Sequence, residues 1–446
     1  MKKIIIFFAA LLVSASFVRA QDSMLGIDGE ESTSVGIYIK EISTGRVLVD
    51  RNSQMALTPA SVMKAITSAS VLSLEGADRR FETRVALRGS DGGNGTWNGD
   101  VVVHGVADPT LESENFKSRR GFCDSIVASL RRKGISRIAG TVIVEQHMSD
   151  AGPILQWELE DIAWPYGAGL YGFNWRDNTV TVYPNTGRIS PEAPGLTMDV
   201  RRSNTGNDLV RGVYSDRLMV FSRNTRADWA VRTTVPDPAA VFGAELASKL
   251  TAAGISAGSV AESASTDSET PLYTHRSAPF AEILRSLMVR SDNLFAEGML
   301  RSLAPDGRRK DAIAREKELW ATRGVSPRYT IINDGSGLTR ANRLSARFIG
   351  DVLEWMANSP EGETYAGFFP RAGKEGTMRG MLAKSQLKGR IALKTGSVST
   401  VQCYAGYKLD AEGKPTHVIV VLVNGFFCPR SQVRKGTERL LERTFL

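Results

Sequence analysis

Three short motifs place several hydroxyls, two amines and an amide at spacings that suit hydrolysis by an activated serine. The S-x-x-K motif at residues 61–64 sets Ser61 and Lys64 three positions apart, which puts both side chains on one face of a helix. S-D-N follows at residues 291–293, and K-T-G-S at residues 394–397. A serine hydroxyl needs a neighbouring base, and a lysine amine can be that base when burial or a second cation keeps it neutral. We therefore predict Ser61 as the nucleophile and Lys64 as its base.

The surroundings of the first motif separate it from a chance match. S-x-x-K occurs again at residues 385–388, in a short polar stretch without a cap or apolar periodicity, which predicts a surface loop. Before Ser61, Thr58 can cap a helix whose first position is Pro59, and apolar residues recur at helical spacing up to Gly76. Ser61 is thus expected in the first turn of a helix, where free N–H groups stabilise an oxyanion.

Metal-dependent and histidine-dependent hydrolysis have less support. The four histidines, at positions 104, 147, 275 and 417, lie far apart, and the sequence contains neither H-E-x-x-H nor a Cys/His cluster. None of them has the context of a Ser-His-Asp triad. We therefore expect no metal and no other cofactor.

The first twenty residues predict a secretory signal peptide at 1–20. A basic start, an apolar stretch over residues 4–18 and small residues before a cleavage site after Ala20 favour this interpretation over an uncleaved anchor. Its removal takes three basic residues and lowers the formal charge from +8 to 8 − 3 = +5. Because Lys and Arg form no run, a nucleic-acid partner is not expected. We expect an exported, periplasmic protein without a stable transmembrane anchor.

The predicted elements arrange the motifs within one interrupted domain. A strand hairpin is expected at 34–52, and three further strands are expected at 389–394, 403–409 and 417–423. Helical patterns are found at 278–303, 310–323, 343–357 and 432–445. Short alternating strands with Gly-rich turns fill the region between the first helix and an acidic, Ser-rich linker at 263–270.

From these elements we predict an α/β (α+β) fold in which both chain ends contribute to one antiparallel sheet. The catalytic domain would comprise residues 21–80 and 268–446. A large β-rich insertion at 81–267 would interrupt it and hold a smaller nested module at about 184–230.

Together the three motifs resemble the signature shared by penicillin-binding proteins and class A β-lactamases. The 291 − 61 = 230 residues between the first two motifs exceed what a compact β-lactamase carries. They resemble the low-molecular-mass class C penicillin-binding proteins, which are D-alanyl-D-alanine carboxypeptidases/endopeptidases. Stretches at 105–111, 334–340 and 373–378 are similar to the same family. The resemblance implies a β-lactamase-like serine transpeptidase domain with the antiparallel sheet flanked by helices, peptidoglycan stem peptides as substrates, and β-lactam antibiotics as inhibitors.

The resemblance also implies a catalytic role for each motif. Ser61 would attack the carbonyl of the penultimate D-alanine, and Lys64, with Lys394 as the second cation, would accept its proton. Ser291 would pass a proton to the departing amine. The backbone N–H groups of Ser61 and Ser397 would hold the oxyanion.

Substrate contacts follow from the same resemblance. Asn293 would hold the substrate backbone amide, and the terminal carboxylate would be received by Lys394, Thr395 and Ser397. Gly396 would allow close approach of the substrate backbone, because no side chain intrudes there. Residues 157–161 resemble a segment whose acid faces the amine of the peptide's diamino acid, which nominates Asp161.

Two rival functions and the state of the cysteines stay open at this point. A serine β-lactamase would share the acylation step, and a non-catalytic wall-binding or β-lactam-sensing protein would share the fold. Cys403 and Cys428 flank a predicted hairpin and could pair in an exported protein, whereas Cys123 has no nearby partner in sequence. All three are equally consistent with buried, reduced side chains.

Overall fold

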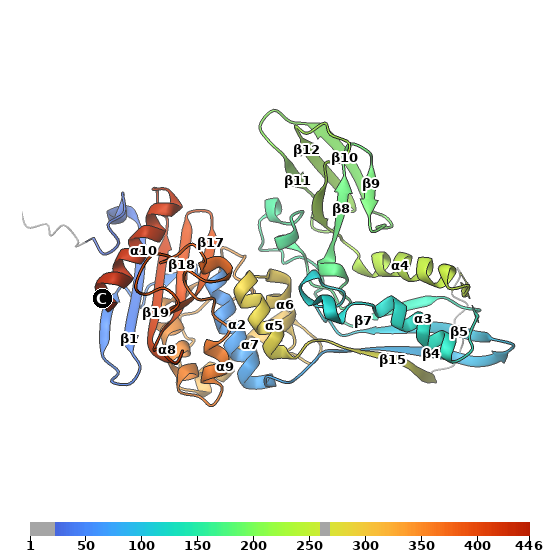
Figure 1. Ribbon diagram of the computed structural model, residues 1–446, viewed down its shortest axis with the longest axis horizontal. Coiled ribbons are helices and arrows are strands. Elements are labelled where there is room, and N and C mark those ends of the chain that lie inside the picture. Colours follow the sequence, from blue (N-terminus) through green and yellow to red (C-terminus); the bar gives the residue numbers. More distant parts are fainter. Residues whose placement is uncertain (1–22, 259–267) are drawn as a thin grey trace, which may run out of the picture.

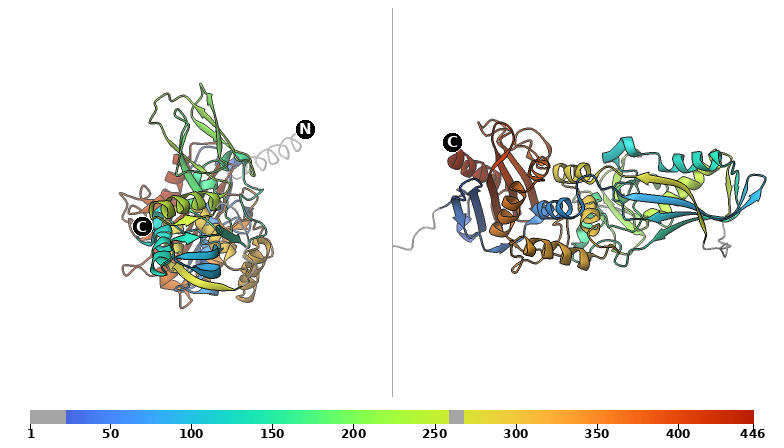
Figure 2. Two further views of the ribbon diagram at one scale, coloured as in Figure 1. Left: turned by 90° about the vertical axis from the view of Figure 1, so that its right-hand side faces the viewer. Right: turned by 90° about the horizontal axis from the view of Figure 1, so that it is seen from below.

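The computed structural model describes residues 23–258 and 268–446. The predicted signal peptide at 1–20 and most of the predicted linker at 263–270 lie outside these described residues. The molecule is elongated, with a helix-and-sheet part that contains the C-terminus and a strand-rich part that extends away from it (Figures 1 and 2). Within the described ranges, no helix is long and apolar enough to cross a membrane.

A five-stranded antiparallel sheet joins the beginning and the end of the described chain. Its order is β17-β18-β19-β1-β2. The strands are β1 (Ser34–Glu41), β2 (Val47–Arg51), β17 (Ile391–Val398), β18 (Val401–Leu409) and β19 (Pro415–Asn424). In the central pair, β1 runs against β19 from Ser34 opposite Asn424 to Glu41 opposite His417. The predicted sheet, built from the N-terminal hairpin and three C-terminal strands, is confirmed.

Both faces of this sheet are buried, because apolar residues follow one another along its inner strands. In β19 the even-numbered residues Val418 to Leu422 pack into one core, and the odd-numbered residues Ile419 to Val423 pack into another. On the first face, α2 (Met63–Glu75) and α8 (Ala346–Ala357) pack against the sheet. The same core continues into the helices that pack against these two, α5 (Phe280–Arg290), α6 (Asn293–Arg301), α7 (Arg309–Thr322) and α9 (Gly362–Ala366). α10 (Arg430–Phe445) covers the second face (Figure 1).

The helical region predicted at 278–303 is two helices, and the break falls on the S-D-N motif. Ser291 ends α5 with a left-handed backbone (φ 61°). Asp292 then caps α6, since its carboxylate accepts a hydrogen bond of 3.0 Å from the Phe295 N–H. At this break Ser291 contacts Lys394 of strand β17, and Asn293 contacts Lys64 of helix α2.

The strand-rich part has its own sheet and its own core. The sheet has the order β14-β6-β5-β4-β15, with β7 also paired to β5. Its strands are β4 (Glu82–Gly93), β5 (Thr96–Gly105), β6 (Arg137–Ile138), β7 (Val142–Gln146), β14 (Ser256–Ala257) and β15 (Glu269–Arg276). Two helices, α3 (Phe122–Arg132) and α4 (Pro238–Ala252), pack on it through a cluster of aromatic side chains that includes Phe122, Trp175 and Phe242.

One strand of this sheet lies beyond the predicted domain boundary at residue 268. β15 runs antiparallel to β4, with Glu269 opposite Arg88 and Arg276 opposite Glu82. Its residues are mostly exposed and lack an alternating apolar pattern, so periodicity gives no sign of a strand there.

Two small sheets complete the strand-rich part. One has the order β13-β8-β9, from Val231–Thr234, Thr179–Tyr183 and Arg188–Ser190. The other has the order β10-β12-β11, from Thr197–Arg202, Arg217–Ser222 and Asp208–Val210, and projects from the rest of the molecule (Figure 1). The second sheet lies inside the segment predicted as a nested module at about 184–230.

The two parts meet closely at α6. A Cβ on Gly298 would lie 2.6 Å from the ring of Pro109, so α6 can pack this closely against the strand-rich part only because residue 298 has no side chain.

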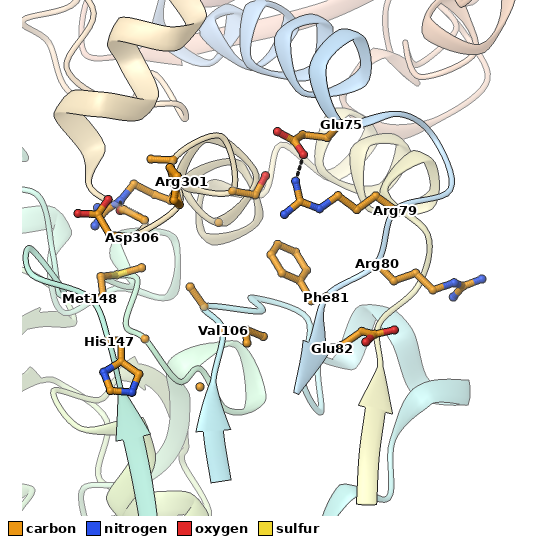
Figure 3. A pocket seen from close by; sticks show the side chains of 18 of the residues that line it. Glu75, Arg79, Arg80, Phe81, Glu82, Val106, His147, Met148, Arg301 and Asp306 are labelled. Atoms are coloured by element: carbon orange, nitrogen blue, oxygen red, sulfur yellow. Dashed lines mark hydrogen bonds and ion pairs between the residues drawn. The ribbon is translucent and has the colours of Figure 1, made fainter. Parts of the chain in front are cut away.

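Beside this contact lies a cavity of about 490 Å³, lined by Arg79, Arg301 and other residues of both parts (Figure 3). Within its lining, Glu75 pairs with Arg79 and Arg315, and Arg301 pairs with Asp150, which lies outside the lining. None of the predicted site residues lines it.

Candidate active site

Ser61 lies in a tight turn that leads directly into α2. The turn is a single 3₁₀ segment, Ala60–Val62, and Ala60 has a left-handed backbone (φ 46°), which is uncommon outside glycine. The predicted cap is wrong, because the Thr58 hydroxyl donates to the carbonyl of Arg340 at 3.3 Å and makes no bond to the start of the helix. Contacts with residues distant in the chain therefore place the turn that carries Ser61.

Two glycines allow other segments to approach this turn. A Cβ on Gly337, which has φ +75°, would collide with the Ala60 carbonyl. A Cβ on Gly396 would lie 2.6 Å from the Pro59 carbonyl and 3.0 Å from the Ser61 nitrogen. The atoms closest to Gly396 thus belong to the turn that carries Ser61, so strand β17 lies against the backbone beside Ser61.

The Lys64 amine is surrounded by three hydrogen-bond partners and is fully buried. Its Nζ lies 3.0 Å from Ser61 Oγ, 2.6 Å from Asn293 Oδ1 and 2.6 Å from the carbonyl oxygen of Ser336. The carbonyl and amide oxygens can only accept hydrogen bonds, so both require an N–H from Lys64. A neutral amine has two N–H groups and one lone pair. When Lys64 is neutral, its lone pair is therefore directed at the Ser61 hydroxyl.

Burial favours this neutral form. It lowers the pKa of Lys64 to about 8, against an opposing effect from the nearby carboxylates of Asp334, Glu297 and Asp292. The pKa of Lys394 also lies well below its ordinary value, first because the side chain is buried and second because of the charge on Lys64. Two buried amines this close do not readily carry charge at the same time.

Lys394 and Ser291 form the second pair of the site. Lys394 Nζ lies 2.9 Å from Ser291 Oγ and donates to the carbonyl of Thr395 at 2.6 Å. Lys64 contacts Asn293 of the S-D-N motif, and Lys394 contacts Ser291 of the same motif. Each lysine is thus paired with one hydroxyl, and the S-D-N motif lies between them.

Asn293 connects the site to the strand-rich part. Its Nδ2 donates to the carbonyl of Tyr166 at 2.8 Å, which fixes the amide so that Oδ1 faces Lys64. The Tyr166 hydroxyl in turn donates to Asp161 at 3.0 Å. Burial raises the pKa of Asp161, which is half-buried at the edge of the site. The structure therefore places Asp161 next to the segment that holds Asn293, and away from the two lysines.

Strand β17 presents its open edge to Ser61. β17 is the last strand of its sheet, and the Leu393 N–H points away from β18 to the Pro370 carbonyl. Because backbone direction repeats every second residue in an antiparallel strand, the N–H groups of Thr395 and Ser397 point to the same open side. The side chains of these two residues are held by Thr377 and Gln402, at 2.8 Å and 2.7 Å. The edge is therefore suited to pair with an extended ligand.

A cleft of about 490 Å³ opens beside these groups. Ser61, Ser291, Thr395 and Ser397 line it together with Thr377 and Met378, which belong to the family-like stretch at 373–378. The other lining residues were indicated by no motif, and they are Gly380, Met381, Gln402, Tyr404, Arg430, Ser431 and Arg434.

Sequence reasoning missed the acids behind Lys64. Glu297, in α6, accepts from the N–H groups of Gly335 and Ser336 at 3.0 and 2.8 Å. Asp334 accepts from the Gly337 N–H and from the indole of Trp157. These bonds hold the turn whose Ser336 carbonyl contacts Lys64. The stretch at 334–340 resembles the family in sequence, but the role of a main-chain acceptor such as the Ser336 carbonyl cannot be recognised from side-chain types.

The remaining candidates lie elsewhere or are inert. Residues 385–388 form a turn outside the cleft, as expected of the second S-x-x-K match. Cys123, Cys403 and Cys428 are buried and unpaired as thiols. No group of three or more metal-ligating side chains occurs in the part of the chain that the structure describes.

Comparison with known proteins points to one family. The model of the D-Ala-D-Ala carboxypeptidase 3 (S13) family matches residues 21–440. A D-alanyl-D-alanine carboxypeptidase of Actinomadura sp. (strain R39) is 28% identical over 440 residues, which cover 90% of this chain and 79% of that protein.

Solved structures show the same fold. The crystal structure of penicillin binding protein 4 (dacB) from Haemophilus influenzae superposes with a TM-score of 0.77 at 22% identity, over 93% of this chain and 97% of that one. A predatory peptidoglycan endopeptidase from Bdellovibrio bacteriovorus, Bd3459, gives a TM-score of 0.52 at 15% identity, over 93% and 94% of the two chains. The predicted fold class is confirmed.

Proposed function

The chain belongs to the D-Ala-D-Ala carboxypeptidase 3 (S13) family, and on this premise we propose that it is an exported serine DD-peptidase of peptidoglycan. It removes the terminal D-alanine from stem peptides, cleaves D-alanyl cross-links, or does both, through an acyl-serine at Ser61. β-Lactams acylate the same serine. The observation that carries the proposal is the set of three contacts around Lys64, which directs a neutral amine at the Ser61 hydroxyl.

In the first half of the reaction, Ser61 Oγ attacks the carbonyl carbon of the penultimate D-alanine while Lys64 accepts the hydroxyl proton. The N–H groups of Ser61 and Ser397 hold the oxygen that becomes negative. The bond between the carbonyl carbon and the leaving nitrogen then breaks. Ser291, bonded to Lys394, passes a proton to that nitrogen, and the proton that Lys64 took from Ser61 replaces it. In the second half, the oxygen of a water molecule attacks the ester carbon, the bond between that carbon and Ser61 Oγ breaks, and a proton of the water passes to Ser61.

Substrate is held on both sides of the nucleophile. Asn293, with Nδ2 on the Tyr166 carbonyl, presents its amide beside Lys64 to the substrate backbone. The open edge of β17 at Thr395, Gly396 and Ser397 pairs with the extended peptide and, with Lys394, receives its carboxylate. Asp161 meets the amine of the diamino acid.

We propose the domain division on the same basis. Residues 21–80 and 268–446 form the catalytic domain and residues 81–267 form the insertion. Strand β15 follows residue 268 but belongs to the sheet of the insertion. Separate hydrophobic cores support this division, since one cluster takes all its members from residues 85–255. Within the insertion, the sheet of β10, β11 and β12 supports a small module at about 184–230.

Mass spectrometry tests the mechanism directly. The mature protein incubated with benzylpenicillin is expected to carry one adduct on the peptide containing Ser61, and Ser61→Ala is expected to carry none. Incubation with intact and cross-linked muropeptides then distinguishes terminal cleavage from cross-link cleavage. Unchanged muropeptide cleavage by Ser61→Ala would refute the mechanism. A serine β-lactamase remains the rival enzyme, and sustained nitrocefin hydrolysis over many cycles per second would favour it.

A further inference from the structure

Both acceptors of the Lys64 N–H groups are held by one short segment of the insertion, residues 154–167. The first acceptor is the amide oxygen of Asn293, and the amide nitrogen of the same side chain donates to the carbonyl of Tyr166 in this segment. The second acceptor is the carbonyl of Ser336, which belongs to a turn that the same segment contacts. The direction of the Lys64 amine therefore depends on a part of the chain outside the catalytic domain.

The segment contacts this turn, residues 334–339, through polar and apolar groups. The Trp157 indole N–H donates to Asp334 Oδ2 at 3.0 Å, and the Thr339 hydroxyl donates to the carbonyl of Gln156 at 3.2 Å. Apolar side chains from both sides form a small buried cluster of their own, namely Ile154, Trp157, Ile162 and Leu338. The turn is thus packed and hydrogen-bonded against the insertion.

Asp334 is the group through which Trp157 reaches the Ser336 carbonyl. Its carboxylate is fully buried and belongs to the same turn as that carbonyl. Besides the indole, it accepts hydrogen bonds from the N–H groups of Gly337 and Thr339, the hydroxyl of Ser336 and the amide of Asn342. A buried carboxylate that loses a donor is left with an unmade hydrogen bond, which costs free energy unless its surroundings move. Loss of the indole N–H should therefore displace the turn and its Ser336 carbonyl.

Asp334 also acts on Lys64 through its charge. The charged groups that face Lys64 are the carboxylates of Asp334, Glu297 and Asp292 and the amine of Lys394. Burial lowers the pKa of Lys64 to about 8, and of the three carboxylates Asp334 opposes this shift most. The indole N–H directs a partial positive charge at Asp334 and weakens that opposition, so Trp157 favours the neutral amine.

We infer that Trp157 is a positioning residue for the acylation of Ser61. It acts through Asp334 and the Ser336 carbonyl, which fix the direction of the Lys64 lone pair. The inference rests on the proposed acyl-serine mechanism and assigns one part of the catalytic machinery to the insertion. Ser61 is then fully reactive only when the insertion is docked on the turn.

Trp157→Phe tests this role, because phenylalanine keeps an aromatic ring in the apolar cluster and lacks the indole N–H. The rate constant of Ser61 acylation by benzylpenicillin is expected to fall about tenfold, the scale of losing a hydrogen bond to a charged group. The dissociation constant of the non-covalent complex that precedes acylation should stay unchanged. The pH profile of the rate constant should move to higher pH, because the charge of Asp334 then acts more strongly on Lys64.

Trp97→Phe is the matched control. The Trp97 indole donates to the carbonyl of Arg88 at 3.2 Å inside the insertion, so this variant also loses one indole hydrogen bond. It should keep the wild-type rate constant and pH profile. An unchanged rate constant in Trp157→Phe, or the same fall in Trp97→Phe, would overturn the inference. A change confined to the dissociation constant would also overturn it, since Trp157 would then be a contact for the ligand.

A spectroscopic measurement separates this inference from the proposed function. In protein labelled with lysine that carries ¹³C at Cε, the NMR signal of Lys64 reports the protonation of the amine without any reaction, and Lys64→Arg assigns it. The signal is expected to shift in Trp157→Phe, with its titration midpoint at higher pH, and to stay in place in Trp97→Phe. If wild-type Ser61 does not react with benzylpenicillin and the signal still moves, the proposed function fails and the positioning role stands. A Lys64 signal that is identical in all three proteins overturns the inference, whether or not Ser61 is acylated.

Discussion

Lys64 and Asn293 meet through a hydrogen bond of 2.6 Å, although 229 residues separate them in the chain. The bond uses one of the two N–H groups that a neutral lysine has. Ser336 takes the other through its carbonyl. The geometry therefore leaves the lone pair of Lys64 for Ser61, and the protonation state of one amine is expected to control the reaction.

The rate of Ser61 acylation should rise with pH up to about 8 and then level. The pKa of Lys64 is lowered to about 8, and only the neutral amine can accept a proton. Below that pH the rate should fall by about tenfold per pH unit as the neutral fraction falls. Stopped-flow measurement of acylation by a fluorescent penicillin from pH 6 to 10 gives the profile. A flat profile between pH 6 and 8 would contradict the role of Lys64 as the base.

Glu297→Gln should move this profile to lower pH. The negative charge of Glu297 raises the pKa of Lys64, and the amide removes that charge while it keeps an acceptor for the N–H groups of Gly335 and Ser336. Burial raises the pKa of Glu297 itself to about 7, so the shift should be largest above that pH, where the wild-type carboxylate is charged.

Two further variants control this experiment. Glu297→Ala also removes the acceptor and should lower Tm, because two buried N–H groups lose their partner. Glu318→Gln removes one exposed carboxylate from α7 and should leave the pH profile in place. A profile that moves equally in Glu318→Gln would show that overall charge, and not Glu297, sets the pKa of Lys64.

Gly396→Ala should slow acylation by about a hundredfold, the scale of losing one oxyanion-hole donor. The added Cβ would lie 2.6 Å from the Pro59 carbonyl, so strand β17 and the turn of Ser61 must move apart. Gly243→Ala is the matched control, because nothing lies within 4 Å of its Cβ. Acylation rates and thermal unfolding of both variants provide the measurement. Wild-type rates in Gly396→Ala would mean that β17 does not hold the oxyanion.

The cysteines should be unreactive in the folded protein. All three are buried thiols, and burial raises the pKa of Cys403 to about 12. Titration with Ellman's reagent is expected to detect no fast-reacting thiol in the native state and three after unfolding in guanidinium chloride. A count of one after unfolding would instead indicate the disulfide between Cys403 and Cys428 that their positions allow.

Much of the central sheet and of the candidate site could be predicted, because both depend on the types of side chain along the sequence. The strands of the central sheet follow from apolar runs such as Val418 to Val423, which suit burial on both faces. The S-x-x-K spacing places Ser61 and Lys64 within 3.0 Å, which is what a helical turn requires.

Other parts of the site could not be predicted from local patterns. Thr58 is a good cap by type, but its hydroxyl bonds to Arg340 from a distant segment. The carbonyl groups of Ser336 and Tyr166 are backbone atoms, so their roles are independent of side-chain identity. Glu297 lies in an amphipathic helix, where a glutamate ordinarily indicates the solvent side, and only the folded chain shows that it is buried.

The pairing of β1 with β19 also determines when the site can exist during synthesis. Ser61 and Lys64 leave the ribosome early, whereas β17, which carries Lys394 and the N–H of Ser397, is made more than 300 residues later. Contacts this distant in sequence slow folding, because a long loop must close before they form. A chain truncated before residue 391 is therefore expected to leave Ser61 inert toward β-lactams, and Ser61 is expected to become reactive only when nearly all of the protein has been made.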